Sequence, residues 1–142
     1  MKNCNLGNWD KKCEEIVNQQ INLEYWTSYQ YHLMWSYFDR SDVGLSNIAN
    51  YFKKASDEER EHAHKLMEYQ NKRGGNVVFT DVKNVSLNYL NLHIDNVNIK
   101  SDVLLSFEKA LEMEQKVYKS LLNVHKVGDE CNDPQFTDFI EG

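Results

Sequence analysis

Two residues with metal-binding side chains interrupt an otherwise apolar helical pattern near the middle of the chain. Glu59 and His62 share a heptad-spaced stripe with these apolar or aromatic residues: Ile48, Phe52, Ala55, Leu66 and Tyr69. A buried carboxylate is costly unless it is paired, protonated or bound to a metal. The three-residue separation places Glu59 and His62 on one helical face, where a carboxylate oxygen and an imidazole nitrogen can reach the same cation.

Two further acids occupy comparable positions in other segments. Glu24 lies in an apolar stripe that also contains Tyr31, and Glu114 lies between Ala110 and Val117 in a third stripe. Three stripes that each carry an acid, together with one histidine, predict a cation held between helices. Carboxylate and imidazole ligands suit hard to intermediate divalent metals, and the lack of cysteine among them disfavours copper(I) and iron–sulfur clusters.

Each of these residues also has a purely structural interpretation. Glu59 and His62 are compatible with a buried acid–histidine pair, Glu24 with a half-exposed side chain, and Tyr31 with an ordinary core aromatic. A helical interaction module whose acids pair with basic groups is a further alternative, although few Lys or Arg lie on these stripes. Taken together, the three acids and the histidine favour a metal site.

Composition restricts the class of protein. The 142 residues suffice for one domain, which we expect to span residues 1–142, and the 27% charged and 41% hydrophobic content is ordinary for a soluble globular protein. A net charge of −6 without a Lys/Arg block argues against a nucleic-acid or anionic-membrane partner. No apolar run has the length of a membrane span, and the N-terminus lacks an apolar signal core.

The cysteines suggest a compartment. There are three, and they show no C-x-x-C spacing: Cys4, Cys13 and Cys131. A disulfide framework is therefore not expected, and a reducing environment is the default. Together with the missing signal core, this predicts a cytoplasmic location.

The pattern predicts an all-α protein. We expect helices at residues 9–38, 45–72 and 101–126, with Gly74 and Gly75 ending the second and Gly128 ending the third. Asp133 and Pro134 predict the start of a fourth helix. Residues 76–100 lack helix signals and read as a long connection, which allows the second and third helices to run parallel, as in bundles with one crossover.

Several short motifs carry a resemblance to a known family. They are Gln20-Ile21-Asn22-Leu23-Glu24, Tyr37-Phe38-Asp39-Arg40, Glu58-Glu59-Arg60-Glu61-His62-Ala63, Lys65-Leu66-Met67, Gln70-Asn71-Lys72-Arg73-Gly74-Gly75 and Asn132-Asp133-Pro134. Over nearly the whole chain the sequence resembles ferritin, and it resembles the ferroxidase-active heavy-chain type more than the inactive light-chain type.

The resemblance implies a ferritin-like four-helix bundle whose subunits, as homo- or hetero-oligomers, form a hollow shell of twenty-four. It implies oxidation of Fe(II) by dioxygen at a di-iron centre within the subunit and storage of the ferric mineral. By position, Glu24, Glu59 and His62 match the ligands of the first iron, Glu59 and Glu114 match those of the second, and Tyr31 matches a tyrosine beside the centre.

The resemblance implies further iron contacts and one departure. Glu58 and Glu61 match inner-surface acids, and Asp138 and Glu141 match acids of a threefold entry channel. Most of the fourth helix and all of the fifth are missing before Gly142, so the core stripes of the other helices should face water. This departure favours an alternative function, a shell subunit that promotes mineral formation without oxidising iron.

Overall fold

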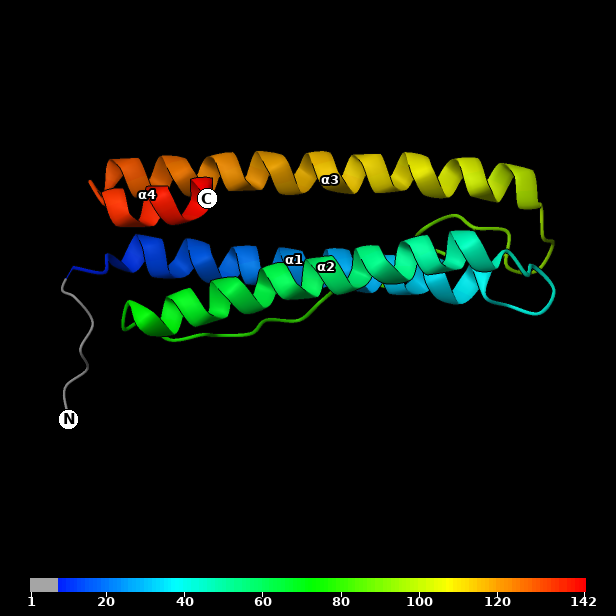
Figure 1. Ribbon diagram of the computed structural model, residues 1–142, viewed down its shortest axis with the longest axis horizontal. Helices are drawn as coiled ribbons and strands as arrows, with labels where there is room; N and C mark the ends of the chain where they lie inside the picture. The colour runs from blue at the N-terminus through cyan, green and yellow to red at the C-terminus, as the bar shows by residue number, and fades with distance from the viewer. Residues whose placement is uncertain (1–7) are drawn as a thin grey trace.

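The computed structural model describes residues 8–142, and these residues form four α-helices and no strand. The all-α prediction is confirmed. The first helix, α1, spans Lys11–Phe38. It begins where the side chain of Asp10 accepts a hydrogen bond of 2.8 Å from the Lys12 amide, which satisfies one of the free amides of the first turn. The second helix, α2, spans Ser46–Lys72 and runs back along α1 (Figure 1).

The end of α2 follows the predicted glycine signal. Gly74 has a φ of 85°, in the left-handed region that glycine adopts without steric cost. Its amide bonds to the carbonyl of Asn71, and the amide of Gly75 bonds to that of Gln70. The helix therefore stops at Lys72, and the chain turns into the long connection.

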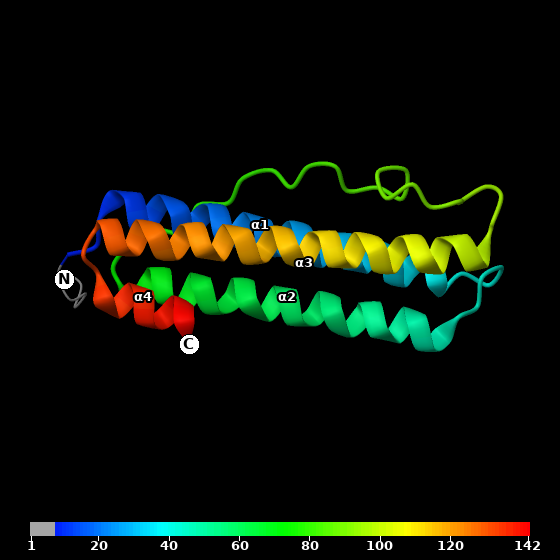
Figure 2. The same ribbon diagram turned by 90° about the horizontal axis from the view of Figure 1, so that it is seen from above.

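The connection is irregular and crosses the length of the molecule, flanking α1 on the side away from α2 (Figure 2). Amide side chains of α1 hold it in place: Asn18 donates to the carbonyl of Asn76, and Gln30 donates to that of Asn84 at 2.7 Å. Farther along, the guanidinium of Arg40 donates to the carbonyl of Ile94. The crossover lets α3 start at the same end of the bundle as α2, so the two run parallel as predicted.

The third helix, α3, spans Ile99–Glu130, and α4 spans Pro134–Glu141. The predicted stop of α3 at Gly128 is wrong, because the helix continues through that residue. Gly128 serves packing instead: a β-carbon there would lie 2.9 Å from the Thr137 side chain and 3.0 Å from that of Phe136 on α4. The start of α4 is as predicted, with the Asp133 side chain accepting from the Phe136 amide at 3.0 Å.

Two apolar clusters form the core, one toward each end of the bundle. One surrounds Phe38 and Phe52, and the other surrounds Val17 and Phe136. Glu24 and Glu59 belong to neither cluster. The polar residues of the site are thus flanked by apolar packing that fixes the spacing of α1, α2 and α3.

One face of α3 is open to solvent. Figures 1 and 2 show α4 beside only the last part of α3, and large apolar side chains on the remainder are exposed: Leu104, Leu111, Tyr118 and Leu122. The expectation that core stripes would face water therefore holds for part of α3 only, because the stripes of α1 and α2 are largely buried. Among residues 8–142, no helix combines the length and the apolar character needed to cross a bilayer.

Candidate metal centre

Glu24 on α1 and the Glu59–His62 pair on α2 meet between the two helices. The Nδ1 atom of His62 lies 3.3 Å from a carboxylate oxygen of Glu59 and 3.8 Å from Oε1 of Glu24. One potential ligand atom from each residue falls within 4.8 Å of the other two. The helix period accounts for the Glu59–His62 contact, and the antiparallel packing of α1 on α2 brings Glu24 to them.

Burial leaves one oxygen of the Glu24 carboxylate without a hydrogen bond. Glu24 is 2% exposed and Glu59 is 4% exposed, whereas the His62 side chain is half exposed. Oε2 of Glu24 accepts a hydrogen bond of 2.9 Å from the Gln20 side chain, but Oε1 is buried and has no hydrogen-bond partner. A buried carboxylate oxygen without a partner is costly, and a divalent cation beside His62 and Glu59 would satisfy it.

The pKa values of Glu59 and His62 are raised, whereas that of Glu24 is lowered. Burial raises the pKa of Glu59 to about 8, and the neighbouring carboxylates of Glu24 and Glu59 raise the pKa of His62 to about 10. Burial also acts to raise the pKa of Glu24, but its contacts with His62, Glu59 and Gln20 outweigh burial and lower that pKa. In the metal-free site, Glu59 and His62 therefore carry protons at neutral pH. A bound cation would take the place of these protons and supply the positive charge.

The fourth predicted ligand comes from α3. Tyr31 is buried, and its hydroxyl donates a hydrogen bond of 2.8 Å to Oε1 of Glu114. The sequence pattern predicts a buried Glu114, but Glu114 is exposed in the structure. The structure groups Glu24, Glu59 and His62, and Glu114 lies near enough to help raise the pKa of Glu59.

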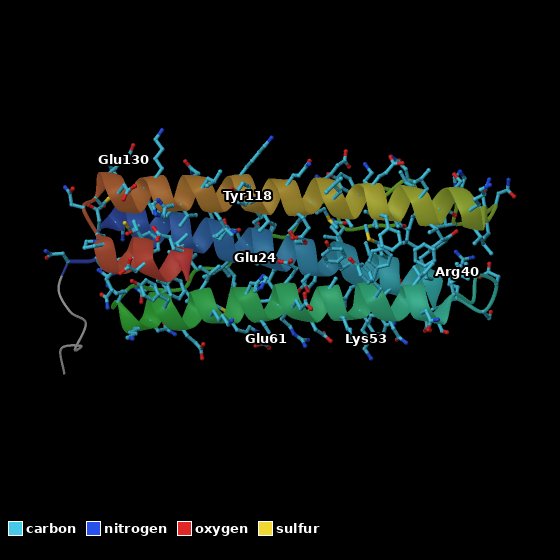
Figure 3. The ribbon with its side chains drawn as sticks, turned by 45° about the horizontal axis from the view of Figure 1, so that its top comes forward. Glu24, Arg40, Lys53, Glu61, Tyr118 and Glu130 are labelled. Atoms are coloured by element: carbon cyan, nitrogen blue, oxygen red, sulfur yellow. The ribbon has the colours of Figure 1, made fainter. Side chains whose placement is uncertain are left out.

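The remaining predicted residues lie on the surface. Glu58 and Glu61 are exposed on α2, and Figure 3 shows Glu61 on the edge of α2 that faces away from Glu24. Asp138 is exposed and lines an open groove that also contacts Glu24 and His62. Glu141 accepts a hydrogen bond of 2.6 Å from His125 on α3.

Sequence reasoning missed a role for Gln20. Besides donating to Glu24, its carbonyl oxygen accepts a hydrogen bond of 2.5 Å from the Ser120 hydroxyl of α3. Gln20 therefore orients the carboxylate and connects α1 to α3. The sequence feature that indicates this role is the position of Gln20, one helical turn before Glu24 on the same helical face.

The fold and the site define the class of helical bundles that hold metal ions between facing helices through carboxylate and histidine ligands. A family model described as a ferritin-like domain matches residues 14–142. The chain is 50% identical over 134 residues to a chloroplastic ferritin of Malus baccata var. xiaojinensis, covering 94% of this chain and 51% of that protein. Chloroplastic ferritins of Phaseolus vulgaris (48% identical) and Pisum sativum (46%) match 92% and 95% of this chain and 49% and 51% of their own lengths.

This chain belongs to the ferritin family. It spans about half the length of the curated relatives it matches. The predicted cytoplasmic location is wrong, because the relatives are named as chloroplastic proteins. That prediction rested on the absence of an apolar signal core and on the number of cysteines. Neither feature detects the segments that target a protein to an organelle.

Proposed function

We propose that this chain is an iron-storage subunit that oxidises Fe(II) to Fe(III) with dioxygen at a di-iron centre between α1, α2 and α3. The observation that carries the proposal is the grouping of Glu24, Glu59 and His62 around Oε1 of Glu24, a buried atom that has no hydrogen-bond partner. Membership of the ferritin family and the ferritin relatives support iron as the metal. We take residues 1–142 as one ferritin-like domain.

Each residue has a role in this proposal. Glu24, Glu59 and His62 hold the first Fe(II), while Glu59 also reaches the second Fe(II), which Glu114 binds from α3. Two irons each lose one electron, and dioxygen accepts these electrons. Hard carboxylate oxygens stabilise Fe(III) more than Fe(II), so the ligand set favours oxidation. Tyr31 positions Glu114 through its 2.8 Å hydrogen bond.

The surface acids supply a route for iron. Asp138 lines the groove that leads to Glu24 and His62, and the net charge of −6 favours cations near the surface. In this proposal Asp138 and Glu141 serve entry, while Glu58 and Glu61 receive iron on the inner surface. The chain assembles with other ferritin subunits, identical or different, and the relatives' names support a plastid location.

Stopped-flow absorbance after addition of Fe(II) under air tests the oxidation. We expect rapid formation of Fe(III) with the native chain and its loss in a Glu59→Ala, His62→Ala double variant. Glu68→Ala is the matched control, because Glu68 is an exposed acid on the same helix and has no role in the proposal. Equal rates in the native chain and the double variant would exclude this site as the oxidation centre.

A second candidate function is a shell subunit that promotes mineral formation without oxidising iron. The exposure of Glu114 favours it, because a ligand on an uncovered face is less well positioned. Mixing the chain with an intact ferritin separates the two. An oxidation rate that rises with the share of this chain supports the oxidase, and an unchanged rate with a larger mineral supports the second candidate. Light scattering coupled to size-exclusion chromatography reports whether the two assemble.

A further inference from the structure

Two cysteine thiols meet at the end of the bundle where α1 begins and α3 gives way to α4. Cys13 is fully buried in the first turns of α1, and Cys131 is the partly buried residue that follows α3. Both belong to the apolar cluster around Val17 and Phe136. Both thiols are free in the structure, and Cys131 lies near enough to Cys13 to help raise the pKa of the Cys13 thiol.

The surroundings hold this pair in place. Arg73 makes a two-pronged, buried ion pair with Asp133, at 3.1 and 2.7 Å, two residues beyond Cys131. The same guanidinium lies over the Trp9 ring, four residues before Cys13, and Trp9 packs edge-on against Phe136 at 5.0 Å. These contacts join the start of α1, the end of α2 and the start of α4 into one packed unit.

The turn after α3 fixes the direction of Cys131. The Cys131 amide bonds to the carbonyl of Val127, and the Asp133 amide bonds back to that of Gly128. Asn132, with a φ of 52°, completes the turn between them. Cys131 is thus held by backbone hydrogen bonds on one side and by the Asp133–Arg73 ion pair on the other, so its thiol keeps its place beside Cys13.

We propose that Cys13 and Cys131 form a reversible intramolecular disulfide when the protein meets a peroxide, so that this end of the bundle is a thiol oxidation site. Neither residue belongs to the metal centre, and the proposal does not depend on iron oxidation. The bond would join the first turns of α1 to the α3–α4 turn and close a loop that contains most of the chain. Closing so long a loop restricts the unfolded chain strongly and stabilises the fold.

The chemistry proceeds in two balanced steps. The partly exposed Cys131 reacts first. Its thiol loses a proton, the thiolate attacks one oxygen of hydrogen peroxide, the O–O bond breaks and a sulfenic acid forms, while the departing hydroxide takes up that proton and leaves as water. The sulfur of Cys13 then attacks the sulfenic sulfur, the S–O bond breaks, and the hydroxyl leaves as water with the proton of Cys13. The two thiols are oxidised together by two electrons, and the peroxide is reduced.

The two thiols are suited to different roles. Cys13 lies in an apolar and acidic setting, where burial raises its pKa to about 12, so it stays a thiol at neutral pH. It is also shielded from solvent, so peroxide does not reach it directly. Cys13 therefore acts as the resolving thiol, and Cys131 as the thiol that meets the oxidant.

The test exposes the full chain to hydrogen peroxide in the presence of a metal chelator, alkylates the remaining thiols, and identifies linked peptides by mass spectrometry. We expect one peptide pair joined through Cys13 and Cys131, lighter by two hydrogen atoms than the reduced pair and separated by a reducing agent. The third cysteine, Cys4, lies outside the described residues, so Cys4→Ser serves as the control that must keep the linkage.

Thermal unfolding gives an independent check on the disulfide. The peroxide-treated protein should have a higher Tm than the reduced protein, and Cys131→Ser should remove both the linked peptide and this difference. Cys131 is only partly buried, so its replacement disturbs the core less than replacement of the fully buried Cys13. If the treated Cys4→Ser protein still alkylates at both remaining cysteines, or oxidises Cys131 without linking it to Cys13, the proposal is wrong.

Discussion

The hydroxyl of Tyr31 on α1 donates a hydrogen bond of 2.8 Å to the carboxylate of Glu114 on α3. Burial and the Glu114 carboxylate raise the pKa of Tyr31, so the phenol stays protonated and remains a donor at neutral pH. Tyr31 is buried and stacks against Phe52, whereas Glu114 is exposed. The buried tyrosine therefore sets the position of the exposed acid that is proposed to bind the second iron.

Replacing Tyr31 with Phe should weaken the second of the two iron sites. Outer hydrogen-bond partners of metal ligands contribute roughly 10–100-fold in metal affinity, and we expect a loss of that size for the second Fe(II). The first Fe(II) should bind as before. Anaerobic titration calorimetry measures both, with Tyr29→Phe as the control because Tyr29 is exposed on the same helix. An equal loss at both sites would mean that Tyr31 supports the fold and not Glu114.

Binding of a redox-inert divalent metal should release protons. With a pKa of about 8 for Glu59 and about 10 for His62, both groups hold protons at pH 7 in the metal-free protein. A cation requires both ligands deprotonated, so Zn(II) affinity should rise with pH up to about pH 10, most steeply below about pH 8. Calorimetry in buffers of different ionisation enthalpy counts the released protons. Identical heats in two such buffers would contradict these protonation states.

Asp102 should stabilise the junction of the crossover and α3 in a pH-dependent way. Its buried carboxylate accepts hydrogen bonds from the Tyr37 hydroxyl and the His93 ring, and also from the His93 amide at 3.2 Å. Burial acts to raise the pKa of Asp102, but these hydrogen bonds outweigh it and lower the pKa. The stabilisation is therefore present above the unfolded-state pKa of about 3.9 and is lost as pH falls through the lower folded-state pKa.

We expect Asp102→Asn to reduce the free energy of unfolding at pH 7 by about 1–3 kcal/mol, the cost of disturbing buried hydrogen bonds. The difference from the native chain should shrink below about pH 4. Urea denaturation at both pH values measures it. Asp95→Asn, an exposed change in the same connection, should leave stability unaltered. A deficit for Asp102→Asn that stays constant down to low pH would show that its charge is not involved.

Adding a single methyl group at Gly128 should displace α4. The new β-carbon would lie 2.9 Å from the Thr137 side chain and 3.0 Å from the Phe136 ring, closer than packed carbons allow. Overpacking of this kind costs about 1–3 kcal/mol, so Gly128→Ala should lower Tm although alanine favours helix. Glu130→Ala, an exposed change two residues later, is the control. A higher Tm for Gly128→Ala would mean that α4 does not pack on this surface.

The helices and most of their ends follow from local sequence. Asp133 and Pro134 mark the start of α4, and Gly74 marks the end of α2, because caps depend on near neighbours. Gly128 shows the limit of this reasoning. The same residue type that ends one helix lies inside another, because its lack of a side chain serves the contact with α4, which no local pattern reveals.

Some features of the site likewise follow from local sequence, and others depend on packing between distant segments. Glu59 and His62 stand out because they break an apolar stripe, and their contact follows from helix period alone. The exposure of Glu114 and the meeting of Cys13 with Cys131 depend on which helix covers which face, and that is set by packing between distant segments. Gln20 was missed because its function comes from the two side chains that it joins, Glu24 and Ser120.

The most direct test of the metal centre is anomalous X-ray diffraction at the iron edge from crystals of this protein soaked anaerobically in Fe(II). The account predicts a peak between Glu24, Glu59 and His62, with a carboxylate oxygen from each acid and a ring nitrogen of His62 in contact with the ion. Peaks confined to exposed acids such as Glu61, with none among these three residues, would contradict it.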